Sequence, residues 1–112
     1  MNSTLIRAAR MPDGTRGDIA LVDGLFADPA EVVKPSTVID ADGLLALPGL
    51  VDMHTHLREP GREDAETVLT GSRAAAAGGY TAVHAMANTS PVADTAGVVE
   101  QVHHLGRAAG YT

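Results

Sequence analysis

Residues 47–61 read Leu-Pro-Gly-Leu-Val-Asp-Met-His-Thr-His-Leu-Arg-Glu-Pro-Gly, and this stretch decides the fold. The apolar residues Leu50, Val51 and Met53 predict a short buried strand, because Pro-Gly pairs bound the stretch on both sides. Side chains of a strand alternate between its two faces. We therefore expect one face for chemistry and one for packing. The first face carries Asp52, His54, His56 and Arg58, and the second carries Val51, Met53, Thr55 and Leu57.

His54 and His56 form a His-x-His pair near the carboxyl end of this strand. Neutral imidazole is a good ligand for zinc and similar metals, and two imidazoles two residues apart on an extended segment can reach one ion. Parallel α/β proteins place their chemistry at the carboxyl ends of strands. The pair therefore predicts a metal site, with two partly buried structural histidines as the alternative.

Beyond residue 49 the pattern alternates between strand and helix. A helix is expected over 65–77 with Asp64 as its N-cap, followed by a Gly-Gly stop and a buried strand over 80–86. A second helix with an apolar stripe is expected to begin at Asp94 or Thr95. A strand-helix-strand-helix order implies parallel strands joined by right-handed crossovers.

The region before residue 48 has a different pattern. Short apolar segments at 4–9, 18–22 and 37–40 are separated by turn-forming residues, including the hairpin signal Asp23-Gly24. This pattern predicts a small antiparallel β unit with unpaired edges. The chain is thus expected to have a β-rich segment over 1–49 and a βα segment over 50–112.

Composition excludes several classes of partner. The chain has 112 residues and a net charge of −6, and its eight Lys and Arg are scattered, which argues against nucleic acid. It has no Cys, so a metal would rest on His, carboxylates or a modified Lys. No apolar run approaches the length of about 20 residues that a membrane span needs, and no secretory h-region is visible. A cytoplasmic protein is expected.

Residues 48–61 resemble the dihydroorotase signature of the cyclic amidohydrolase family, and 78–81 and 86–91 resemble that family's second barrel strand and the following loop. The resemblance implies the start of a (β/α)₈ TIM-type barrel, preceded by half of a small β-sandwich. Such a barrel needs about 250 residues, so the chain is expected to be the N-terminal part of a longer enzyme. The family's general base and remaining metal ligands would lie beyond Thr112, which leaves no catalytic residue within this chain.

The resemblance also implies roles for four residues. His54 and His56 would bind one or two Zn²⁺ ions, while Arg58 and Asn88 would bind the carboxylate of the substrate. The implied reaction is the reversible hydrolysis of (S)-dihydroorotate to N-carbamoyl-L-aspartate in pyrimidine (UMP) biosynthesis. For Arg58 the alternative is a surface salt bridge to a nearby glutamate, and for Asn88 a turn residue. His84 is expected to be packed and hydrogen-bonded.

Two other functions remain open. One is another cyclic amidohydrolase, such as an allantoinase, hydantoinase or dihydropyrimidinase, although the placement of Arg58 favours a substrate with a carboxylate. The other is a non-catalytic, dihydroorotase-like scaffold subunit of aspartate transcarbamoylase, which retention of His54 and His56 disfavours. A homo-oligomer is compatible with each function. The 112-residue chain alone is expected to bind zinc weakly and to be inactive, because a zinc site needs three or four protein ligands.

Overall fold

The computed structural model describes residues 2–111, and the chain forms two compact units, Met1–Pro48 and Gly49–Thr112. Strands make up most of the first unit, while the second combines strands and helices, so the fold class is mixed α/β. In the part of the chain that the structure describes, neither helix has the length and apolar character needed to cross a membrane.

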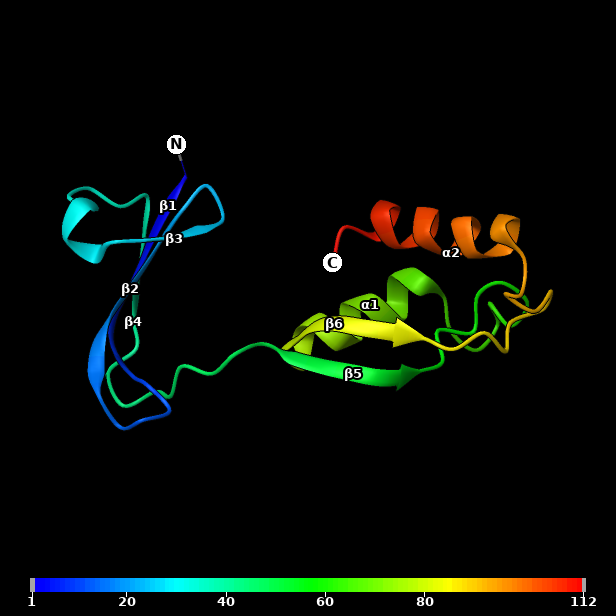
Figure 1. The fold of residues 1–112 in the computed structure, drawn as a ribbon, viewed down its shortest axis with the longest axis horizontal. Coiled ribbons are helices and arrows are strands. Elements are labelled where there is room, and N and C mark those ends of the chain that lie inside the picture. Colours follow the sequence, from blue (N-terminus) through cyan, green and yellow to red (C-terminus); the bar gives the residue numbers. More distant parts are fainter. Residues whose placement is uncertain (1, 112) are drawn as a thin grey trace. The chain divides into compact units, whose positions relative to one another are not determined.

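The first unit is a four-stranded sheet in the order β3-β2-β1-β4 (Figure 1). Its strands are β1 (Ser3–Arg10), β2 (Arg16–Val22), β3 (Leu25–Ala27) and β4 (Thr37–Asp40). The predicted hairpin at Asp23-Gly24 is confirmed, and it joins antiparallel β2 and β3. Both turn residues have positive φ, 50° and 84°, which a tight two-residue hairpin turn requires and which Gly24 adopts without steric cost.

The prediction of a purely antiparallel unit is wrong, because β4 pairs with β1 in parallel. The reason is the connection over residues 28–36, which carries the chain from the β3 edge back to the free edge of β1. It contains a 3₁₀ turn, η1 (Pro29–Glu31), in which the Ala30 N–H donates to the Asp28 carboxylate at 2.9 Å. At its end the Ser36 N–H donates to Ser3 Oγ at 3.1 Å. A crossover of this length allows a parallel pair, which a tight turn does not.

A bulge in β1 provides a stability test. Ala8 lies in the bulge with φ 59°, and its N–H donates to Asp18 Oδ1 at 2.9 Å. A left-handed backbone is costly for an L-residue, so Ala8→Gly should raise the free energy of unfolding by about 0.5–1 kcal/mol. The control is Ala9→Gly, at a buried position with ordinary φ, which should lower it by about 1 kcal/mol. Urea unfolding followed by circular dichroism measures both, and a destabilised Ala8→Gly would contradict the prediction.

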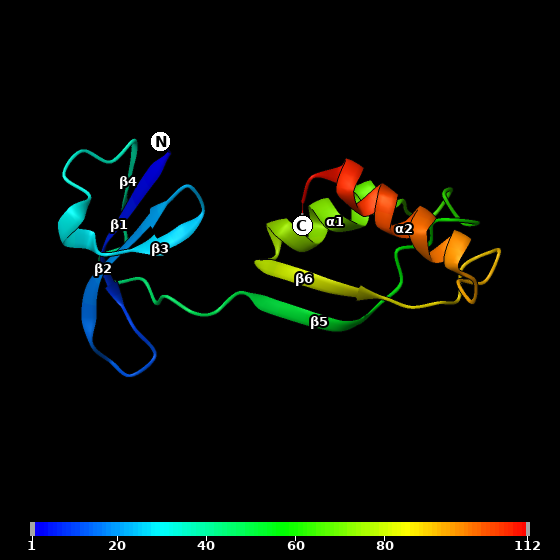
Figure 2. The same cartoon turned by 45° about the horizontal axis from the view of Figure 1, so that its top comes forward.

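The second unit has the predicted order of strand, helix, strand and helix. Its elements are β5 (Leu50–Thr55), α1 (Val68–Ala77), β6 (Tyr80–Ala85) and α2 (Ala96–Ala109). Strands β5 and β6 are parallel, as predicted. Helix α1 contacts both β6 and α2, so it lies at the centre of this unit (Figure 2).

Helix α1 begins later than predicted, and its N-cap is Thr67 and not Asp64. The Thr67 hydroxyl accepts from the Thr70 N–H at 3.1 Å, and the Thr70 hydroxyl accepts from the Thr67 N–H at 2.9 Å. This reciprocal capping box satisfies two N–H groups that the helix itself leaves unpaired. Asp64 instead forms an exposed ion pair with Arg62.

Strand β5 is less buried than its apolar sequence suggests. Val51 and Met53, which were predicted to pack, are 51% and 67% exposed. Among the described residues β5 packs substantially against β6 alone, and helix α1 contacts β6, so no helix covers these side chains. The buried apolar side chains of this unit include Leu57, just after β5, and Val68, the first residue of helix α1.

Candidate metal and substrate site

The carboxyl end of β5 contains a β-bulge at the histidine pair. The register with β6 shifts between Asp52 and Thr55, so that three steps along β5 match two along β6. The His54 N–H donates to Asp52 Oδ1 at 2.9 Å and thereby closes the bulge. Bulges redirect side chains and are frequent beside active sites. The sequence did not reveal this structural role of Asp52.

The structure brings His54 and His56 together. Their ring centroids are 5.0 Å apart with planes inclined at 65°, so the two imidazoles lie edge to face. His54 is exposed and His56 half-buried. His56 lies one residue beyond the end of β5, and its Nδ1 is 2.8 Å from Asn88 Oδ1 in the loop after β6. Sequence reasoning missed this contact, because it joins residues 32 positions apart.

The prediction that Arg58 lies on a strand face with the histidines is wrong, because β5 ends at Thr55. Arg58 lies instead at the centre of a tight turn, in which the Glu59 N–H donates to the Leu57 oxygen at 2.8 Å. Its φ of 63° is unusual for a residue with a side chain, and such γ-turns are rare and strained. Strain of this kind is concentrated at functional sites, so the turn marks Arg58 as a candidate binding residue.

The guanidinium of Arg58 is exposed and makes no ion pair within residues 2–111. The two glutamates that could have paired with it have other partners. Glu59 Oε2 accepts from the Val68 N–H at the start of α1, at 2.7 Å. Glu63 Oε1 accepts from the Gly61 N–H at 2.9 Å. The predicted alternative of a salt bridge from Arg58 to these residues is therefore wrong.

The hydrogen bond from Gly61 lowers the pKa of the Glu63 carboxyl. Because the pKa is lower in the folded chain, the stabilisation that this contact gives is present at neutral pH and is lost as the pH falls through the lowered pKa. Glu63 is exposed, so the contact orders the loop and adds little to stability.

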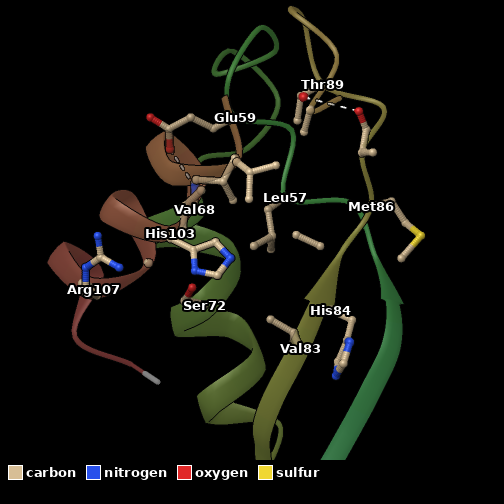
Figure 3. Close-up of a pocket in the computed structure, with 16 residues that line it drawn as sticks. Leu57, Glu59, Val68, Ser72, Val83, His84, Met86, Thr89, His103 and Arg107 are labelled. Carbon is tan, nitrogen blue, oxygen red and sulfur yellow. Dashed lines mark hydrogen bonds between the residues drawn. The ribbon is translucent and has the colours of Figure 1, made fainter. Parts of the chain in front are cut away.

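The segment that carries Arg58 is anchored on helix α1. Leu57 is buried against Gly71, where an added Cβ would lie 2.6 Å from a Leu57 methyl carbon. The Glu59 carboxylate adds a cap at the positive end of the helix, where negative charge is favourable. The close-up in Figure 3 shows Glu59 reaching Val68, with Leu57 below them. Arg58 is thus exposed between two anchored neighbours.

Three hydrogen bonds connect the end of β5 and the loop after it to the loop after β6. The Met86 N–H donates to the Thr55 oxygen at 2.8 Å, His56 and Asn88 pair at 2.8 Å, and the Ser90 N–H donates to the Pro60 oxygen at 2.9 Å. At the last of these links Gly61, with φ 109°, approaches Ser90 so closely that a Cβ would lie 2.6 Å from it. The two loops therefore form one connected surface, which we call the paired loops (residues 55–61 and 86–90).

A cavity of about 590 Å³ lies beside the paired loops, between β6 and the two helices (Figure 3). Its lining is mostly apolar and includes Leu57, Val83 and Val102. None of the four predicted site residues lines it. His84 lines it but is exposed and lacks a hydrogen-bond partner within residues 2–111, so the prediction of a packed, hydrogen-bonded His84 is wrong.

The donor set fits part of a metal site. Two neighbouring imidazoles are present, but within residues 2–111 no cluster of three or more His, Asp or Glu side chains could hold an ion. Catalytic zinc sites use three protein ligands or more. These residues can therefore supply two ligands of a larger set.

Both the structure and the sequence of this chain are similar to those of cyclic amidohydrolases. The structure resembles that of the L-hydantoinase (dihydropyrimidinase) from Arthrobacter aurescens, with a TM-score of 0.81 and 28% identity over 95% of this chain and 25% of that one. Dihydroorotases from Leifsonia xyli subsp. xyli and Streptomyces coelicolor are 65% and 60% identical, over 96% and 99% of this chain. The dihydroorotase from Mycobacterium tuberculosis is 54% identical over 96% of it. Dihydroorotases and hydantoinases are both cyclic amidohydrolases.

A family model described as dihydro-orotase-like matches residues 43–109, which is more than half of the chain. The chain belongs to the dihydro-orotase-like family. It spans about a quarter of the length of the curated relatives, 25% to 26% for these three. The matched residues include the histidine pair, Arg58 and Asn88.

Proposed function

We propose that this chain is part of a dihydroorotase, which hydrolyses the ring amide of (S)-dihydroorotate reversibly to N-carbamoyl-L-aspartate in pyrimidine biosynthesis. The observation that carries the proposal is the pair of imidazoles, with ring centroids 5.0 Å apart, on the same segment (residues 54–58) as a guanidinium without an ion-pair partner within residues 2–111. The identity of 65% to a dihydroorotase supports this choice of substrate.

In this proposal His54 and His56 hold zinc together with ligands from outside these residues. When bound, zinc supplies Lewis-acid chemistry, because it lowers the pKa of water and polarises the scissile carbonyl. Arg58 binds the substrate carboxylate through two parallel N–H donors, a geometry that matches a planar carboxylate. Asn88 adds amide N–H donors from the other loop of the pair. A general base from elsewhere in the enzyme completes the site.

The proposal extends to the architecture. The second unit would form the first two βα units of a (β/α)₈ barrel, whose active site lies at the carboxyl ends of its strands, where the paired loops are. The first unit would form part of a small β-sandwich. Its free edges at β3 and β4 would then pair with or be covered by other segments. Absence of Cys fits a cytoplasmic enzyme.

A second candidate function follows from the similarity to the L-hydantoinase. Hydantoin and allantoin lack a carboxylate, so Arg58 would have no anion to bind. We expect the complete protein that contains this chain to hydrolyse dihydroorotate with a kcat/KM at least about 100-fold above that for hydantoin or allantoin. The reason is that only dihydroorotate offers a carboxylate for a charge-assisted bidentate contact with Arg58. Assays of the three substrates side by side, with zinc content measured, test this. A preference for hydantoin would favour the second candidate, and a protein without zinc or turnover would favour a scaffold.

A further inference from the structure

The two candidate metal ligands differ in how they are held. Within residues 2–111 the side chain of His56 makes one hydrogen bond, to Asn88 Oδ1 at 2.8 Å, in addition to its edge-to-face contact with the ring of His54. The ring nitrogens of His54 have no hydrogen-bond partner in the same range. A hydrogen bond therefore fixes the orientation of the His56 imidazole, whereas none from the described residues fixes that of His54.

The chemistry of the contact determines where the proton of His56 lies. The acceptor is the amide oxygen Oδ1 of Asn88, which cannot donate. Nδ1 of His56 must then carry the proton, and a neutral ring has its lone pair on Nε2. Metal-binding histidines commonly donate their second ring N–H to a carbonyl or carboxylate, which sets the tautomer and the ring orientation. Asn88 supplies that acceptor here.

The amide of Asn88 also has a donor group, its NH₂. Nδ2 of Asn88 carries two N–H donors, Asn88 is exposed, and its Nδ2 makes no hydrogen bond within residues 2–111. The loop that carries it is held by the Met86 and Ser90 backbone bonds of the paired loops. A rigid amide can therefore accept from His56 on one side and donate to an anionic substrate on the other.

We propose that Asn88 is a positioning residue for the metal: its Oδ1 holds the Nδ1 proton of His56, so that Nε2 faces the cation, while its Nδ2 remains free to donate to the substrate carboxylate. This inference rests on the proposed function and adds to it, because Asn88 acts on the metal through His56 as well as on the substrate. Removing the amide should thus weaken zinc binding even when no substrate is present.

The test uses the complete protein, stripped of metal, with zinc affinity measured by competition with a chromophoric chelator. Asn88→Leu, which has a similar shape and no acceptor, should weaken zinc binding about 10- to 100-fold. Asn88→Asp keeps the acceptor and should retain zinc affinity within a few-fold. It should also raise the KM for dihydroorotate, because a carboxylate donates nothing and repels the carboxylate of the substrate. Ser90→Ala, in the same loop, is the matched control and should change neither quantity.

A second measurement uses the wild-type protein and therefore does not require that any variant folds. Nitrogen-15 chemical shifts of the His56 ring in the metal-free wild-type protein should show the proton on Nδ1. Proton occupancy on Nε2, or an Asn88→Leu protein with native circular dichroism and wild-type zinc affinity, would overturn the inference. If the wild-type protein itself binds no zinc, the proposed function fails, whereas equal binding by wild type and Asn88→Leu removes the inference alone.

Discussion

Replacing Arg58 by lysine should lower kcat/KM for dihydroorotate about 100-fold and leave the zinc content unchanged. Arginine presents two parallel N–H donors to a carboxylate, and lysine presents a single point charge. A loss of 100-fold corresponds to about 2.7 kcal/mol of transition-state stabilisation. The strained turn at Arg58 and the lack of an ion pair within residues 2–111 are the reasons to expect so large an effect. Steady-state kinetics and metal analysis of the complete protein measure it.

Arg62→Lys is the matched control for this variant. Arg62 lies four residues further along the same segment, is exposed, and already pairs with Asp64. Exposed pairs of this kind contribute little, so its kinetics should stay within about two-fold of the wild type. Wild-type kinetics of Arg58→Lys would remove Arg58 from the substrate site. A loss of zinc in that variant would instead give Arg58 a structural role.

His54→Ala should abolish activity by removing a metal ligand. We expect zinc affinity to fall by more than about 100-fold, since loss of a direct ligand costs more than loss of a partner that only orients one. Activity should fall by at least about 10³-fold, because the metal contributes several kcal/mol to the hydrolysis. The bulge hydrogen bond uses the backbone N–H of His54 and not its ring, so the alanine variant keeps the local fold.

His104→Ala controls for the general loss of an imidazole. His104 is exposed on α2 and does not line the cavity beside the paired loops. This variant should bind zinc and turn over substrate as the wild type does. The zinc content of both variants is measured by inductively coupled plasma mass spectrometry after dialysis, and their activity by a kinetic assay. Stoichiometric zinc and full activity in His54→Ala would refute the metal assignment of the His-x-His pair.

Most secondary structure followed from local patterns. The alternation of strand and helix beyond residue 49 and the hairpin at Asp23-Gly24 were predicted because turn residues and apolar runs act within a few positions. The parallel direction of β4 was not predicted, because a nine-residue connection can return the chain to either edge of a sheet. The start of α1 was assigned to Asp64, although the spacing of Thr67 and Thr70 already carried the signal of a reciprocal cap.

At the site the sequence placed the histidine pair correctly at the end of a strand, and the structure brings the two rings together. It could not predict the contact between His56 and Asn88, because that contact depends on the register of two strands and on a bulge in one of them. Arg58 was assigned to a strand face, but simple alternation fails where the backbone enters a turn with positive φ. Exposure of Val51 and Met53 was also unforeseen, since an apolar run predicts burial without naming what covers it.

The three hydrogen bonds between the paired loops also bear on how such a protein can be recombined. Two of these bonds join backbone atoms and depend on the conformations of both loops, and the third joins the side chains of His56 and Asn88, so replacing one loop with that of a distant homologue would leave the other with mismatched neighbours. Residues 50–93 contain both loops and the strands that carry them. A chimaera that exchanges this whole segment should therefore tolerate its junctions better than one that exchanges either loop alone.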